Sequence, residues 1–253
     1  MKIIVLKKIA IVIVACVVLV LSAFALNAKV LDVGGVYFTT GKKLPIYSVE
    51  TEEDKLAISF DAAWGADKTR EIMAVCKEYD ITATFFLVGF WVEKYPDMVK
   101  EIYNNGFEIG IHSSTHPDMT KLNKKQIREE LACNIKAVED LTGFTPKLFR
   151  PPFGYYNNDL IDVCQELNLQ CIEWSVDSLD WKGLTAGEIA SRVTSKAGRG
   201  SIVLFHNNSD NIIEGLKMTL QYFKDNKLQV VPIGQLIYNE NYTINNQGVQ
   251  IKK

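Results

Sequence analysis

From Leu56 onward, short runs of β-branched and aromatic residues alternate with segments of helical periodicity. This alternation is typical of βαβ units, in which helices join parallel strands and cover the sheet. Seven runs are predicted as strands: Leu56–Phe60, Thr82–Val88, Phe107–Ile111, Lys147–Arg150, Gln170–Val176, Ser201–Phe205 and Leu228–Val231. We therefore expect a single α/β domain that forms an irregular barrel of seven βα units. A doubly wound open sheet is the structural alternative.

The segments between these runs carry helix start and stop signals. Pro96 fits the first turn of one helix. Asn123 can cap the next helix, which Gly143 ends. That helix has an apolar stripe made of Ile127, Leu131, Ile135 and Val138. Thr185 and Glu188 have the spacing of a capping box, so a further helix is expected after Thr185.

The amino terminus has the pattern of a membrane segment. Residues Ile9–Leu26 form a run of 18 uncharged, mostly apolar residues, and three lysines precede it. Such a helix is about 27 Å long, close to the roughly 30 Å hydrocarbon core of a bilayer. The lysines predict a cytoplasmic amino terminus and an exported domain. Ala23-Phe24-Ala25 resembles a cleavage site, so secretion after cleavage is the alternative to a single-pass anchor in the cell membrane.

The net charge of the exported part limits its possible binding partners, and its cysteines indicate whether disulfide bonds are expected. From Val30 to Lys253 the chain has 24 basic and 30 acidic residues, a formal charge of −6. Nucleic acid is therefore not an expected partner. The cysteines of this part lack a C-x-x-C pair, and we expect buried reduced thiols rather than a disulfide framework at Cys76, Cys133, Cys164 and Cys171.

Polar side chains follow several of the predicted strands. The chain has only three histidines, and two of them, His112 and His206, come directly after strand-like runs. The other residues placed in this way are Asp61, Arg150 and Asp177. Because a parallel β/α barrel gathers the carboxyl ends of its strands around one mouth, these side chains are predicted to converge on a reaction site.

Three local motifs suggest roles there. His112 and His116, four residues apart, could meet one divalent cation, although catalytic zinc usually takes three protein ligands. In Arg150-Pro151-Pro152-Phe153, the first available backbone N–H after the prolines belongs to Phe153, a candidate to face an oxyanion. A carboxylate beside His206 would raise the pKa of its imidazole and suit it to general acid catalysis. Each motif alone is as consistent with a structural role.

The order of these motifs resembles the polysaccharide deacetylase family, also called the NodB-homology domain or carbohydrate esterase family four. The resemblance covers about Lys55–Tyr238. Within the family, Phe60–Gly65, which reads F-D-A-A-W-G, is similar to the first motif of membrane-anchored sporulation deacetylases of PdaB type. The resemblance implies a distorted (β/α)7 barrel that removes acetyl groups from N-acetylated sugars with a bound divalent metal, and zinc is the expected ion.

The resemblance also implies roles for residues. Asp61 would be the general base and His206 the general acid, with Arg150 orienting the first and Asp177 tuning the second. The metal ligands would be His112 and His116. The oxyanion and acetyl-pocket residues would be Phe153, Trp181 and Leu204. In this chemistry the metal polarises the amide carbonyl, the base takes a proton from water and the acid protonates the leaving amine.

The chain departs from the family pattern at one position. The first motif usually has a second aspartate that serves as the third metal ligand, and here that residue is Ala62. Metal affinity should therefore fall, unless Asp67 or Asp118 substitutes. Two functions remain open: a deacetylase with a weakened metal site, and a catalytically impaired glycan-binding homologue. A different metal-dependent hydrolase is a third, although the first strand has no H-x-H pair.

The expected organisation has four parts: a cytoplasmic tip and signal-anchor at residues 1–29, a linker at 30–53 with a short strand near Leu44–Val49, the deacetylase-like barrel at 54–240, and a tail at 241–253. The expected partner is an N-acetylated glycan, with cell-wall peptidoglycan or spore cortex as the substrate that the resemblance implies. Four aromatic residues are candidates to stack on its sugar rings: Trp64, Trp91, Tyr155 and Tyr156.

Overall fold

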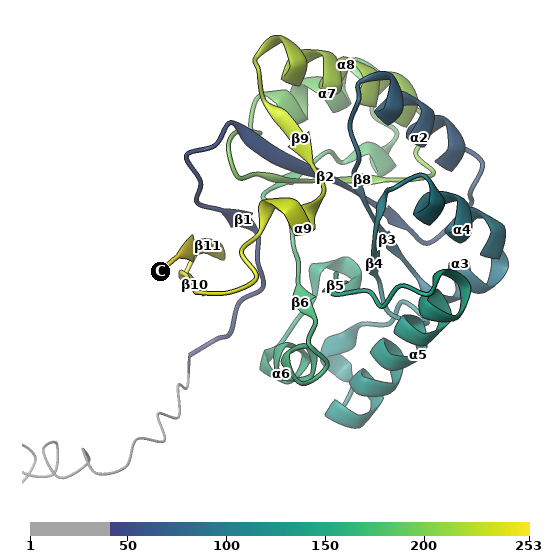
Figure 1. Ribbon diagram of the computed structural model, residues 1–253, viewed down its shortest axis with the longest axis vertical. Coiled ribbons are helices and arrows are strands. Elements are labelled where there is room, and N and C mark those ends of the chain that lie inside the picture. Colours follow the sequence, from purple (N-terminus) through teal and green to yellow (C-terminus); the bar gives the residue numbers. More distant parts are fainter. Residues whose placement is uncertain (1–40) are drawn as a thin grey trace, which may run out of the picture. The chain divides into compact units, whose positions relative to one another are not determined.

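The computed structural model describes residues 41–253, so the predicted signal-anchor at residues 9–26 lies outside the described residues. In the unit Lys42–Lys253, a curled parallel sheet is surrounded by helices on its outer side (Figure 1). Its strands are β2 (Lys55–Ala62), β3 (Thr84–Leu87), β4 (Glu108–Ile111), β5 (Leu148–Phe149), β6 (Gln170–Cys171), β7 (Val176–Asp177), β8 (Ile202–His206) and β9 (Gln229–Val231).

The order of the strands is that of a barrel. The sheet runs β6-β5-β4-β3-β2-β8-β7, and β9 pairs with the start of β2. Strands that follow each other in the chain lie side by side, and β8 returns to pair with β2. This order has no switch point, so the doubly wound alternative is wrong. The predicted strand Gln170–Val176 is divided into β6 and β7, which end the two edges of the sheet and leave the barrel incompletely closed.

The helices are α2 (Thr69–Glu78), α3 (Gly89–Lys94), α4 (Pro96–Asn104), α5 (Lys124–Thr142), α6 (Asn158–Glu166), α7 (Ala186–Thr194), α8 (Ile212–Asp225) and α9 (Ile233–Leu236). The predicted helix signals are confirmed. Pro96 begins α4, and Asn123 caps α5 through its side chain while Gly143 ends that helix at φ 70°. Thr185 forms a capping box at the start of α7.

Strand β2 lies in the middle of the fold. Seven of its eight residues are buried, as expected for a parallel strand that is covered on both sides. Phe60 stacks between Phe85 and Phe205, with ring centroids 5.0 and 5.8 Å away. Ser59, a buried polar residue in this strand, donates a hydrogen bond to the carbonyl of Val203. This packing fixes the end of β2, where Asp61 lies.

A second, small sheet joins the two ends of the described chain. It consists of β1 (Ser48–Val49), β11 (Val249–Lys252) and β10 (Tyr242–Ile244). The short strand expected near Leu44–Val49 is thus present as β1. The segment 241–253, which we expected as a tail, contains the two other strands.

Two further expectations concern the helices and the cysteines. Within residues 41–253, no helix has both the length and the apolar character needed to cross a membrane. All four cysteines of this part are free thiols. Three of them are buried as expected, whereas Cys133 is exposed because it lies on the outer face of α5.

Candidate active site

The predicted strand-end residues meet at one edge of the sheet. Asp61 and His206 lie at the ends of β2 and β8, where they are register partners, so both side chains lie on the same side of the sheet. A cavity of about 620 Å³ opens at this edge. Its lining includes eight predicted site residues: Asp61, His112, His116, Phe153, Asp177, Trp181, Leu204 and His206. The ninth, Arg150, is fully buried and contacts Asp61.

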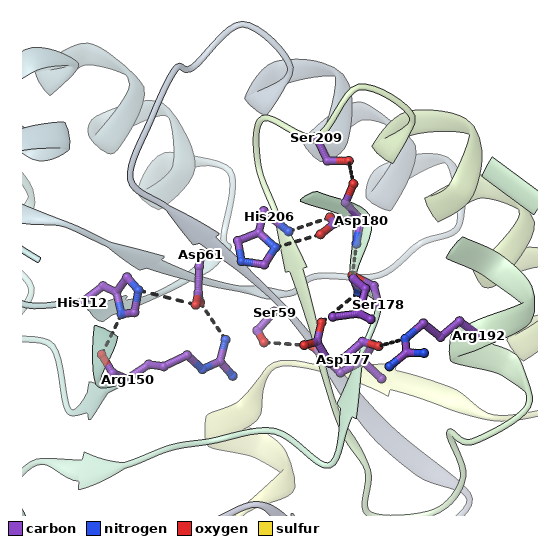
Figure 2. Close-up of polar contacts among 12 residues, drawn as sticks. Ser59, Asp61, His112, Arg150, Asp177, Ser178, Asp180, Arg192, His206 and Ser209 are labelled. Carbon is purple, nitrogen blue, oxygen red and sulfur yellow. Dashed lines mark hydrogen bonds and ion pairs between the residues drawn. The ribbon is translucent and has the colours of Figure 1, made fainter. Parts of the chain in front are cut away.

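Asp61 is held by a buried arginine (Figure 2). Nη1 of Arg150 donates to Oδ1 of Asp61 at 2.7 Å. The guanidinium in turn lies over the ring of Phe86, 4.1 Å from its centroid, and Nη2 donates to the carbonyl of Glu173. Burial would raise the pKa of Asp61, but the charges of Arg150 and the histidines outweigh it and hold the pKa below its usual value. The structure thus brings Arg150 into contact with Asp61, and its orienting role stays a prediction.

His206 is paired with a carboxylate that the sequence analysis did not choose (Figure 2). Nδ1 of His206 lies 2.7 Å from Oδ1 of Asp180, and Oδ2 of Asp180 accepts from the backbone N–H of His206. Burial would lower the pKa of His206, but the hydrogen bond and charge of Asp180 raise it overall. The ring therefore has Nε2 left to act on a substrate.

Asp177, which we expected to tune His206, is therefore not its hydrogen-bond partner. The carboxylate of Asp177 accepts from the backbone N–H of Leu179 and acts on His206 only through its charge. Leu179 has φ 52°, and this left-handed turn carries the chain so that the second aspartate of D-S-L-D-W reaches the imidazole. Asp180 is almost fully buried; its carboxylate accepts from the backbone N–H of His206 and its backbone carbonyl accepts from the hydroxyl of Ser209, whereas Asp177 lies at the cavity wall.

The two other histidines form a ring pair on the opposite side of Asp61. Nδ1 of His112 contacts the carbonyl of Arg150 at 2.7 Å, which leaves Nε2 3.5 Å from Oδ2 of Asp61. The ring of His116 lies edge-on to that of His112, with centroids 5.0 Å apart. Burial lowers the pKa of both imidazoles, to about 4 for His116. Both rings are therefore neutral at pH 7, as a metal ligand must be.

The donors around this pair do not complete a metal site. Among residues 41–253, no group of three or more His, Cys, Asp or Glu side chains is arranged to hold a metal ion. Ala62, at the position of the usual third ligand, offers a buried methyl group. Asp67 and Asp118 do not line the cavity, and Asp118 instead accepts hydrogen bonds from Thr120. Two imidazoles fall short of the three protein ligands of a catalytic zinc site.

Two residues of α5 support the histidine loop, and sequence analysis missed both. The side-chain amide of Asn134 donates to the carbonyls of Leu87 and Ser113. One helical turn away, the carboxylate of Glu130 accepts from the backbone N–H groups of Ser114 and Thr115. In the sequence, both residues have the pattern of polar residues on a helix surface. Only the three-dimensional structure shows that they face the loop.

The loop after Arg150 has a strained backbone. Phe153 has φ 62°, a left-handed conformation that is unusual for a bulky residue. Its side chain is 56% exposed and lines the cavity, so burial does not offset the strain. Such strain is found at functional sites, and it agrees with the predicted role of this residue near the reacting group.

Glu173 is a buried carboxyl next to this network that sequence analysis also missed. Its side chain is 2% exposed, and among the described residues Oε1 has no hydrogen-bond partner. Burial raises its pKa to about 8, which the charge of Arg150 only partly offsets. At pH 7 this carboxyl is therefore protonated, and Asp61 remains the anion that Arg150 binds.

The four aromatic candidates divide into two groups. Trp64 and Tyr155 line the cavity. Trp91 is fully buried and donates through Nε1 to the carbonyl of Gly65, so it is a core residue. Tyr156 does not line the cavity, and its hydroxyl contacts that of Tyr47.

Comparison with known proteins agrees with this geometry. A family model described as polysaccharide deacetylase matches residues 48–172. The chain is 34% identical to a peptidoglycan-N-acetylglucosamine deacetylase of Bacillus cereus over 161 residues, which are 64% of this chain and 58% of that protein. It spans about half of the length of the first curated relatives that it matches.

Two solved structures are informative because of their descriptions. A wild-type CE4 family pseudoenzyme from Bacillus anthracis superposes with a TM-score of 0.74 at 30% identity, over 76% of this chain and 68% of that chain. A mutant of that pseudoenzyme with restored enzymatic activity gives a TM-score of 0.74 at 31% identity, over 76% and 70% of the two chains. The fold, the motif residues around the cavity and these matches together show that the chain belongs to the polysaccharide deacetylase family, carbohydrate esterase family four.

Proposed function

We propose that this protein binds N-acetylated cell-wall glycan of the peptidoglycan type and hydrolyses its acetamide groups. One observation carries the proposal: Asp61 and His206, each with its own buried partner, are register partners at the ends of adjacent strands and line the same cavity. Relatives named as peptidoglycan deacetylases support the choice of substrate.

The pair has the protonation states that amide hydrolysis needs. The lowered pKa of Asp61 keeps its carboxylate ionised, and the raised pKa of His206 favours the imidazolium. As the oxygen of a water molecule attacks the acetamide carbon, Asp61 takes a proton from that water. His206 then donates its proton to the sugar nitrogen as the carbon–nitrogen bond breaks, which releases acetate and a free amine.

The oxyanion that develops in this step needs a donor. The backbone N–H of Phe153 is assigned to it, since the strained turn places this residue at the cavity. Trp181 and Leu204 are assigned to the walls around the acetyl group, because both line the same cavity. The family resemblance implies a divalent metal, with zinc as the expected ion. The two imidazoles of His112 and His116 support this part of the resemblance least. None of the steps above is therefore assigned to a metal.

A glycan-binding role without turnover is the second candidate, and Ala62 is the observation that favours it. The cavity and its aromatic lining are complete without the third ligand. The similarity to a pseudoenzyme of the same family supports the same reading.

Acetate release separates the two candidates. The full chain would be incubated with N-acetylated peptidoglycan and with chitin oligomers, after treatment with a chelator and again with added Zn²⁺. Acetate release by the unmodified chain that is lost in the Asp61→Asn variant would support hydrolysis. Binding of the glycan without release under any condition would contradict it and support the binding role.

We also propose that the barrel lies outside the cytoplasmic membrane, held by a single span at residues 9–26 or released after cleavage near Ala25. Support comes from the apolar run and its preceding lysines. Cell fractionation with protease added to intact cells tests this location, because a cytoplasmic domain would be protected.

A further inference from the structure

A segment that precedes the main sheet crosses the opening in the barrel. Strands β6 and β7 are the two edges of that sheet, and the chain between them pairs with Ile46 rather than with a strand of the barrel (Figure 1). The N–H of Ile46 donates to the carbonyl of Cys171 at 2.9 Å, and its carbonyl accepts from the N–H of Glu173 at 2.8 Å. Two residues later, Ser48 pairs with Ser201, which directly precedes β8. The segment therefore runs from one edge of the sheet to the other.

The same segment contacts the loop that follows β5. We name residues 42–47 the strap. The hydroxyl of Tyr47 donates to the hydroxyl of Tyr156 at 3.3 Å. The backbone N–H of Lys43 donates at 2.8 Å to Oδ1 of Asn158, the first residue of α6. The strap thus holds the loop at the point where it passes into α6.

Tyr47 itself is fixed from its other side. Its backbone N–H donates to the carbonyl of Gly248 at 2.9 Å. A Cβ at position 248 would lie only 2.3 Å from Cδ2 of Tyr47, and Gly248 has φ 78°, so only glycine lets the ring pack here. Burial and the hydrogen bond to Tyr156 raise the pKa of Tyr47, which therefore stays a neutral donor at pH 7.

The strained turn of Phe153 and Gly154 lies between groups that the strap holds. Both residues are left-handed, with φ 62° and 71°. A Cβ on Gly154 would lie 3.0 Å from Cη2 of Trp174 and 3.1 Å from Oε2 of Glu173, so the turn rests on these two side chains. The backbone of Glu173 is the one that pairs with the strap. A strained turn persists only where its surroundings hold it, and here the strap contributes to those surroundings.

We propose that Tyr47 is a positioning residue for this turn: its hydrogen bond to Tyr156 holds the backbone N–H of Phe153 at the cavity, where it meets the oxyanion. This inference deepens the proposed function and rests on it for the role of the turn. Tyr47 does not line the cavity, so it acts through Tyr156 rather than on the substrate. It also lies outside the family match, which begins at residue 48.

Hydrogen–deuterium exchange of the full chain tests the position of the turn without any need for turnover. Tyr47→Phe removes the hydroxyl and keeps the ring against Gly248. In this variant the backbone amides of residues 153–155 should exchange about three- to tenfold faster, as expected for the loss of one hydrogen bond between neutral groups. The amides of β2 and β8 should be unchanged. Equal exchange at residues 153–155 in the variant and the unmodified chain would overturn the inference.

Acetate release from N-acetylated peptidoglycan gives the kinetic measurement. In Tyr47→Phe, kcat should fall by about three- to tenfold while KM stays within about twofold, because the oxyanion forms only in the transition state. Tyr156→Phe should give the same loss. The double variant should lose no more than either single one, since both changes remove one hydrogen bond. A higher KM with unchanged kcat, or losses that add, would contradict the assignment.

The matched control is Tyr238→Phe. It removes a hydroxyl that donates to the carbonyl of Glu50 at 2.9 Å, so it also loosens the start of the domain but does not touch the turn. Exchange and kcat should both stay at the level of the unmodified chain. Equal effects in Tyr238→Phe and Tyr47→Phe would overturn the inference, because they would show a general loosening of the amino-terminal segment.

The two measurements keep this inference separable from the proposed function. If the unmodified chain releases no acetate, hydrolysis is contradicted, and the exchange of residues 153–155 alone decides whether Tyr47 positions the turn. If acetate is released and Tyr47→Phe changes neither kcat nor exchange, hydrolysis is supported and the role of Tyr47 is overturned.

Discussion

The two halves of the cavity differ in how completely they are built. On one side, Asp61 and His206 each contact a buried partner of opposite charge, Arg150 and Asp180. On the other side, a hydrogen bond from Asn134 holds the loop that carries His112 and His116, and both rings are neutral. Among residues 41–253, however, no third side chain completes a metal site with them. The comparison teaches that proton transfer and cation binding are separately encoded here, because different residues supply them and one set can be incomplete while the other is intact.

The largest expected effect comes from Asp61→Asn. The amide is close in shape to the carboxylate but cannot accept a proton from water, so acetate release should fall by roughly 10²- to 10⁴-fold. Circular dichroism and thermal unfolding would show that the fold is retained. Unchanged turnover would show that Asp61 is not the base. It would also contradict the conclusion that the acid–base side of the cavity is intact.

The next effect is expected from Ala62→Asp, which tests the incomplete half directly. A third oxygen ligand beside two imidazoles should tighten Zn²⁺ binding by on the order of 100-fold, since four-ligand zinc sites bind with roughly 10–16 kcal/mol in total. Calorimetry with Zn²⁺ measures it, and Ala62→Val, which changes the same position without adding a ligand oxygen, is the matched control. No change in affinity would take His112 and His116 out of a metal site.

A smaller effect is expected from Asp180→Asn. Without the negative charge, the pKa of His206 should fall towards or below its ordinary value. Because the imidazole must be protonated to act as an acid, the alkaline limb of the pH profile of kcat/KM should move to lower pH, with a loss of about 10- to 100-fold at pH 7. Asp177→Asn is the control with a smaller shift. Equal shifts in both variants would contradict the assignment of Asp180.

Much of this arrangement follows from the sequence, and the exceptions have physical reasons. Asp61 and His206 could be predicted because each ends an uninterrupted buried run, and parallel strands bring such ends together. Asp180 could not, because the left-handed turn at Leu179 decides which aspartate of the loop faces His206. Glu173 was missed because it lies inside the predicted strand Gln170–Val176, whose middle leaves the sheet between β6 and β7.

The smallest change in activity is expected from Glu173→Gln, which mimics the protonated carboxyl. The measurable effect of this variant is on the pH dependence of the free energy of unfolding. The unfolded chain loses this proton near pH 4.5, whereas the folded chain keeps it to about pH 8, so the unfolded state binds fewer protons between these values. The free energy of unfolding contributed by Glu173 therefore falls as pH rises through this window.

Urea unfolding at pH 4.5, 6 and 8 measures this dependence. Relative to the unmodified chain, Glu173→Gln should gain stability progressively from pH 4.5 to pH 8. A difference that is the same at all three values would show that Glu173 is ionised in the folded protein, and Arg150 would then be shared between two anions.

The register between β2 and β8 has a consequence for how such a protein can change. Hydrogen-bonded strands can shift only in whole-residue steps, and a shift of one residue would turn one of the two side chains to the other face of the sheet. The spacing of Asp61 and His206 is therefore retained or lost as a unit, and it cannot drift. A residue without a ligand oxygen at position 62 leaves this spacing intact, so the geometry of the acid and the base does not depend on whether the cation site is complete.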